Sequence, residues 1–90
     1  MATLFKADGS RLEMTPVKDG HFSLEELQKA VGGYIEMVWL SPKLVMICNE
    51  EGKLMGLPYN AVATQMFYYH TKRSDLIVGD VLVCKYTEVR

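Results

Sequence analysis

The feature that most constrains this 90-residue chain is a series of apolar runs joined by very short turns. YIEMVWL, rich in β-branched and aromatic residues, is followed by the turn Ser41–Lys43 and by a second run, KLVMICN. The turn NEEGK, with Gly52 expected at a left-handed position, then predicts a returning strand in KLMGL. Because such short turns allow only antiparallel neighbours, the three runs predict an antiparallel meander.

Two further segments have strand character. ATLFKA and RLEMTPV, separated by DGS, predict a hairpin in which Gly9 takes a positive φ angle. DLIVGDVLVCKYTEV, near the end of the chain, is a long β-prone run that is broken at Gly79 and Asp80. That break predicts either a turn or a bulge.

Two helices are expected between these strands. Ser23 and Glu26 have the spacing of a capping box, and Gly32 follows as a stop, so a helix is predicted over Leu24–Val31. Asn60 is a good N-cap for AVATQMFYYH. In that second helix, an apolar stripe of Val62, Met66 and Tyr69 is expected to face the sheet.

The order of elements is therefore β-β-α-β-β-β-α-β within one domain covering residues 1–90. It predicts an α+β fold, a mainly antiparallel sheet with two helices packed on it.

Composition narrows the class of protein. With ten basic and eleven acidic residues the formal charge is −1, so no basic field exists to hold a long nucleic acid. The apolar runs are too short to cross a bilayer, and MATLFKADGS lacks the apolar core of a signal peptide. Cys48 and Cys84 lie inside apolar runs, without the paired spacing of a zinc site. We expect a cytoplasmic protein with two buried free thiols, no metal and no cofactor.

No set of nucleophile, base and orienting group is apparent in the sequence. His21 and His70 flank the predicted helices, and the acid pairs Glu25–Glu26 and Glu50–Glu51 suit a helix start and a turn. The glycine pair at 32–33 follows a helix rather than preceding one, which is the wrong order for a phosphate cradle. These patterns favour a protein that is not an enzyme.

Polar residues beside apolar ones are the candidates for a binding site. Asn60, Thr64 and Tyr68 are spaced by four residues, so they form one stripe of the second helix. Lys72 and Arg73 follow, either to meet a phosphate or as solvated helix-end cations. Asn60 could equally be only a cap, and Asn49 only a side chain that stabilises a turn. The candidate ligand-binding residues are Tyr34, Asn49, Asn60, Thr64, Tyr68, Lys72 and Arg73.

AVGGYIEMVWL, then ICNEEGKLMGLPYN, AT and IVGDVLV resemble a family of small proteins called domain of unknown function 3846. The resemblance covers roughly residues 24–84. Its shared pieces are Gly33, Tyr34, Ile35 and Glu36; Asn49, Glu50, Glu51, Gly52 and Lys53; Leu57, Pro58 and Asn60; Ala63 and Thr64; and Gly79 with Asp80.

The resemblance implies a phage-type accessory protein that acts in a bacterial cytoplasm. By analogy with small phage proteins that sequester cyclic nucleotides, it implies a non-enzymatic module that binds a small nucleotide signal of host defence. One alternative is an inhibitor that docks on a host defence enzyme, and a third is a nucleotide-processing enzyme. A homo-oligomer is expected, because so short a chain carries Trp39, five tyrosines and six methionines.

Overall fold

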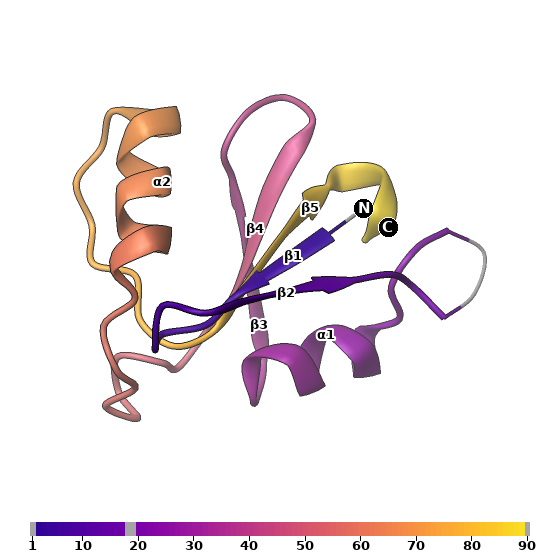
Figure 1. Ribbon diagram of the computed structural model, residues 1–90, viewed down its shortest axis with the longest axis horizontal. Helices are drawn as coiled ribbons and strands as arrows, with labels where there is room; N and C mark the ends of the chain where they lie inside the picture. The colour runs from indigo at the N-terminus through magenta and orange to yellow at the C-terminus, as the bar shows by residue number, and fades with distance from the viewer. Residues whose placement is uncertain (1, 18–19, 90) are drawn as a thin grey trace.

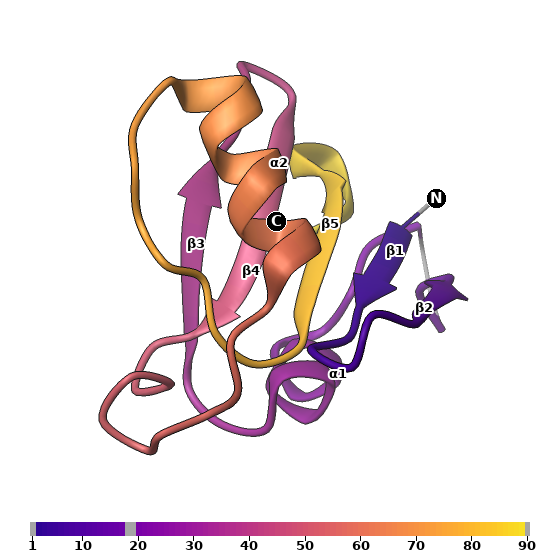
Figure 2. The same ribbon diagram turned by 60° about the vertical axis from the view of Figure 1, so that its left-hand side comes forward.

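A five-stranded antiparallel sheet forms the centre of the protein, with one helix on each face (Figures 1 and 2). This computed structural model describes residues 2–17 and 20–89. The elements are β1 (Ala2–Phe5), β2 (Arg11–Met14), α1 (Leu24–Val31), β3 (Ile35–Trp39), β4 (Leu44–Asn49), α2 (Ala61–Thr71), β5 (Val81–Lys85) and the 3-10 helix η1 (Tyr86–Glu88). The predicted α+β class, with helices packed on an antiparallel sheet, is confirmed.

The strand order is β2-β1-β5-β4-β3, so β5 lies between two hairpins. The first hairpin turns at Gly9, whose φ of 95° confirms the left-handed position expected there. The second joins β3 to β4, pairing Ile35 with Asn49 and Trp39 with Val45. β5 pairs with β1 on one side and β4 on the other, which places β2 and β3 at the two edges.

Alternation along the strands divides the buried side chains between two cores. The core on the α1 side contains Ala2, Leu4, Phe22, Leu27, Val31, Val45, Ile47, Leu82 and Cys84. The core on the α2 side contains Phe5, Leu40, Met46, Cys48, Ala63, Phe67, Ile77, Val81 and Val83. Figure 2 shows α2 lying across the face of β4 and β5, with α1 beyond the other face. Each helix therefore covers its own face of the sheet.

Helix α1 forms where the sequence predicts it. The Ser23 hydroxyl accepts a hydrogen bond from the Glu26 amide at 3.1 Å, and the Glu26 carboxylate accepts one from the Ser23 amide at 2.8 Å. This capping box satisfies amides that the first turn leaves free. Gly32, with a φ of 81°, ends the helix in the left-handed conformation.

The predicted strand KLMGL is wrong. Residues 51–56 form consecutive turns, closed by hydrogen bonds from Met55 to Glu51 (2.9 Å) and from Leu57 to Gly52 (3.0 Å). The physical reason is that β4 already has β3 and β5 on its two sides, so a third meander strand has no partner. Gly52 does not have the expected positive φ either; it is buried, and a Cβ there would lie 3.0 Å from Val78. Close packing explains this glycine.

The final β-prone run forms a shorter strand than its composition suggests. Only residues 81–85 form β5, and residues 75–80 are irregular apart from an isolated bridge between Val78 and Tyr59. Gly79, with a φ of 77°, turns the chain at the predicted break. The Asp80 carboxylate next to it accepts a hydrogen bond from the Ala7 amide at 2.9 Å, which fixes the turn against the end of β1.

Candidate functional site

A cavity of about 300 Å³ lies on the α2 side of the sheet, between the strands and two irregular segments. We call it the charged cavity. Its lining comes from β3, β4, the turns at 50–54, α2 and the segment at 73–78. The apolar lining includes Val38, Cys48, Phe67 and Ile77, and the charged lining consists of Glu36, Glu50, Lys53, Arg73 and Asp75. The cavity thus combines an apolar wall with both signs of charge.

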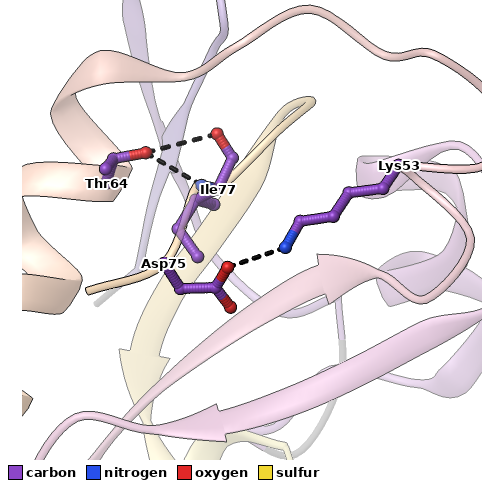
Figure 3. A network of polar contacts seen from close by, with 4 residues as sticks. All are labelled: Lys53, Thr64, Asp75 and Ile77. Atoms are coloured by element: carbon purple, nitrogen blue, oxygen red, sulfur yellow. Dashed lines mark hydrogen bonds and ion pairs between the residues drawn. The ribbon is translucent and has the colours of Figure 1, made fainter. Parts of the chain in front are cut away.

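Two polar contacts hold the segments that wall the cavity (Figure 3). The Thr64 hydroxyl accepts a hydrogen bond from the Ile77 amide at 2.9 Å and donates one to the Ile77 carbonyl at 3.3 Å. Lys53 Nζ lies 2.7 Å from Asp75 Oδ1, and this hydrogen bond lowers the pKa of Asp75. The first contact fastens the segment to α2, and the second fastens it to the turns after β4.

The charges around the cavity are only partly compensated. No described residue forms a hydrogen bond or ion pair with the Glu36 or Glu50 carboxylate. The Arg73 guanidinium lies 5.5 Å from the centre of the Phe67 ring, a cation–π contact that places positive charge beside the apolar wall. The cavity therefore presents hydrogen-bond acceptors and a cation to a single ligand.

The Cys48 thiol, which lines the cavity, stays protonated at neutral pH. Burial, together with the negative charges of Glu36 and Asp75, raises the pKa of Cys48 to about 12. Since the thiolate is the reactive form, this thiol is a poor nucleophile. Burial likewise raises the pKa of Cys84, on the other face of the sheet, to about 12.

The sequence-predicted site residues divide into three groups. Asn49 and Arg73 line the charged cavity. Thr64 and Tyr68 line a second, more open cavity of about 600 Å³, together with Gln65, Ser74, Asp75 and Leu76. Tyr34, Asn60 and Lys72 line neither cavity. Asn49 is buried, donating to the Val31 carbonyl and accepting from the Glu51 amide, so its polar atoms support the turn.

Asn60 is a cap and a buried connector rather than a wall of a cleft. Its side-chain oxygen accepts a hydrogen bond from the Ala63 amide at 3.1 Å, which confirms the predicted cap. Its amide nitrogen donates to the carbonyls of Phe5 (2.9 Å) and Gly79 (2.8 Å). The residue is 1% exposed, so a ligand cannot reach it. The predicted stripe therefore keeps only Thr64 and Tyr68 as accessible members.

The expected apolar face of α2 also needs correction. Ala63 and Phe67 are the buried residues of this helix, whereas Val62 and Met66 are half-buried beside them. Tyr69, expected to face the sheet, is 71% exposed, and the Lys72 ammonium lies 5.3 Å from its ring centre. The helix therefore faces the sheet with a different side from the one expected. Ala63 and Phe67 are four residues apart and lie on that side: the small Ala63 lets the helix backbone approach the sheet, and the Phe67 ring fills the space one turn further on.

The sequence reasoning missed four charged residues of the cavity: Glu36, Glu50, Lys53 and Asp75. The sequence pattern predicts a turn at Glu50 and the start of a β-prone run at Asp75. Three of these four residues, Glu36, Glu50 and Lys53, do lie in the pieces that carry the family resemblance, and that was the available signal.

Within residues 2–17 and 20–89 there is no cluster of three or more His, Cys, Asp or Glu side chains suited to a metal ion. None of the helices in the same residues has the length and apolar character needed to span a bilayer.

Comparison with known proteins yields one match. A family model described as domain of unknown function (DUF3846) matches residues 1–89, nearly the whole chain. The comparisons with curated proteins and with solved structures return no match.

Proposed function

The chain belongs to the DUF3846 family, whose description assigns no activity, and we propose from the charged cavity that it is a non-enzymatic module that binds a small nucleotide. The observation that carries this proposal is the lining: an apolar wall at Phe67, a cation at Arg73, and carboxylates at Glu36 and Glu50 that have no partner among residues 2–17 and 20–89. A nucleotide has the complementary groups, a flat base with amino donors and an anionic phosphate.

Each part of such a ligand has a partner in the cavity. The base would lie against the apolar wall, with its amino groups donating to the Glu36 or Glu50 carboxylate. The phosphate would be bound by Arg73, with Lys53 nearby, since guanidinium groups bind phosphate oxygens through charge-assisted hydrogen bonds. The site is small, with a volume of about 300 Å³, which matches the lower end of small-molecule pockets.

Binding without turnover would remove the nucleotide from solution. This is the role of a sponge for a signalling nucleotide, and it agrees with the phage-type accessory role that the family resemblance implies. A cytoplasmic site of action in a bacterial host follows from the same proposal.

The test is uptake followed by release. The protein is incubated with cyclic mono- and dinucleotides, washed and heat-denatured, and the released compound is identified by mass spectrometry. Release of an unchanged nucleotide is expected. Release of an altered nucleotide would establish an enzyme, and the absence of uptake would refute nucleotide binding.

Two adjacent cations provide a matched pair of variants. Arg73 lines the cavity, whereas its neighbour Lys72 does not. Arg73→Gln should weaken binding about tenfold or more, because a hydrogen bond to a charged group contributes about 1.5–3 kcal/mol. Lys72→Gln should leave the affinity unchanged. Equal losses in both variants would mean that the cavity does not select the ligand.

A protein-docking inhibitor is the second candidate, and one observation favours it. Leu54 is 90% exposed in the turns at the cavity, Met55 beside it is 54% exposed, and Leu76 across the cavity is 61% exposed. Exposed apolar residues grouped around a cavity are typical of protein contacts. If no nucleotide is taken up and Leu54→Asp abolishes inhibition of a host defence enzyme, this candidate replaces the first.

A further inference from the structure

The two edges of the sheet differ in how they are protected. Tyr34 pairs with Glu50 through a hydrogen bond of 2.8 Å, and Leu40 pairs with Leu44 through one of 2.9 Å. Hydrogen-bonded and non-hydrogen-bonded pairs alternate along an antiparallel ladder. Residues 34, 36, 38 and 40 therefore bond to β4, and the odd-numbered residues between 34 and 40 point their backbone groups away from β4. These residues are Ile35, Met37 and Trp39. Their backbone groups face the open edge of β3.

The opposite edge carries charges at the equivalent positions. The Lys6 backbone amide donates a hydrogen bond to the Ser10 carbonyl at 2.9 Å. By the same alternation, the backbone groups of Arg11 and Glu13 on β2 point outward. Charged side chains on an edge strand and a proline close to it, here Pro16, hinder pairing with another chain. β3 has no Lys, Arg or Pro. Its single charged residue is Glu36, whose backbone groups face β4 and not the open edge.

We propose that β3 is a dimerisation strand, which pairs antiparallel with β3 of a second copy about a two-fold axis at Met37. In this register Met37 lies opposite the partner's Met37, and Ile35 lies opposite the partner's Trp39. The outward backbone groups of these three residues then complete each other's hydrogen bonds. The two sheets join into one.

In this register the side chains of β3 fit those of β3 in the second copy. On the α1 side, Ile35, Met37 and Trp39 form an apolar row in which Met37 is 39% and Trp39 46% exposed. The Trp39 ring is already held by Tyr86, with ring centres 4.7 Å apart, so little side-chain freedom is lost on pairing. On the α2 side, Glu36 lies opposite the partner's Val38, so the two carboxylates are not directly opposite each other.

The proposed dimer would bring the charged cavities of the two copies next to each other. Glu36 and Val38 line that cavity and belong to the strand that pairs. Each therefore lies across from a lining residue of the second copy, and the two cavities adjoin on one face of the joined sheet. The segment that follows α2 runs on this same side of the sheet (Figure 2), so both copies of it flank the axis. The interface itself does not depend on any ligand.

A charge exchange at the axis tests the register. Light scattering of the full chain should return twice the 10.2 kDa of one chain. Met37→Lys and Met37→Glu should each be monomeric, because like charges would meet at the axis, and an equal mixture of the two should be dimeric. A monomeric wild type, dimers of either single variant, or a mixture that stays monomeric would overturn the proposal.

Leu12→Lys, a matched change on the exposed opposite edge, should remain dimeric. Loss of the dimer in this variant would contradict the assignment to β3. Should the charged variants fail to fold, Met37→Cys provides a second test: hydrogen-bonded partners have Cα atoms about 5.5 Å apart, within disulfide range. Oxidation should cross-link Met37→Cys but not Ile35→Cys, and the reverse pattern would exclude the register. Because mass and nucleotide uptake are measured separately, failure of one does not imply failure of the other.

Discussion

Replacement of Asn60 tests whether this side chain is a helix cap alone or a connector of three segments. Its amide group reaches the end of β1 at Phe5, the turn at Gly79 and the start of α2 at Ala63. Loss of the cap in Asn60→Ala costs about 1 kcal/mol. Each buried carbonyl that loses its donor adds about 1–3 kcal/mol. The expected loss is about 3–7 kcal/mol, a large part of the roughly 5–15 kcal/mol that holds such a domain together.

Asn60→Asp separates the two roles. Aspartate caps helices as well as asparagine does, so a cap alone would leave the stability within about 0.5 kcal/mol of wild type. In the connector role, the new carboxyl oxygen would face the carbonyls of Phe5 and Gly79 without a proton to donate. A loss at least as large as that of Asn60→Ala is then expected. Urea denaturation at neutral pH measures both variants, and an Asn60→Asp protein as stable as wild type would refute this reasoning.

Three further outcomes are expected. Ser23→Ala should lower the free energy of unfolding by about 1 kcal/mol, since the capping box loses its hydroxyl; an unchanged urea midpoint would contradict the cap. Cys48 and Cys84 should react slowly with a thiol reagent in the native protein and rapidly in denaturant, and fast native labelling would disprove their burial. Phe67→Ala should cost about 3–5 kcal/mol in thermal or urea unfolding, whereas Tyr69→Ala should stay near neutral; the opposite order would mean that α2 faces the other way.

Local chemistry made some of the fold predictable from the sequence. The capping box of α1 depends on Ser23 and Glu26, three residues apart, so the pattern contains its own partners. The left-handed turn at Gly9 is equally local. KLMGL failed because strand formation depends on a free sheet edge, and β5, which occupies that place beside β4, comes from the far end of the chain.

The candidate site was less predictable, because its contacts are distant in sequence. Lys53 and Asp75 are 22 residues apart, and Asn60 bonds to Phe5 across 55 residues. Neither pairing leaves a spacing that could be recognised. In α2, the aromatic residues at 67–69 occur on several sides of the helix, so periodicity could not show that Phe67 faces inward and Tyr69 outward.

The separation of the two cores by the sheet has a consequence for engineering. The α1 core and the α2 core share no side chain, since alternate residues of each strand point to opposite faces. Substitutions in the two layers that lie more than about 7–10 Å apart and share no partner should therefore add independently, within about 0.3–0.5 kcal/mol. A library of variants could be selected for recognition on the α2 layer while the α1 layer is consolidated in parallel. The protein is in this sense a scaffold whose α2 layer can be exchanged without redesigning the α1 layer on the other face of the sheet.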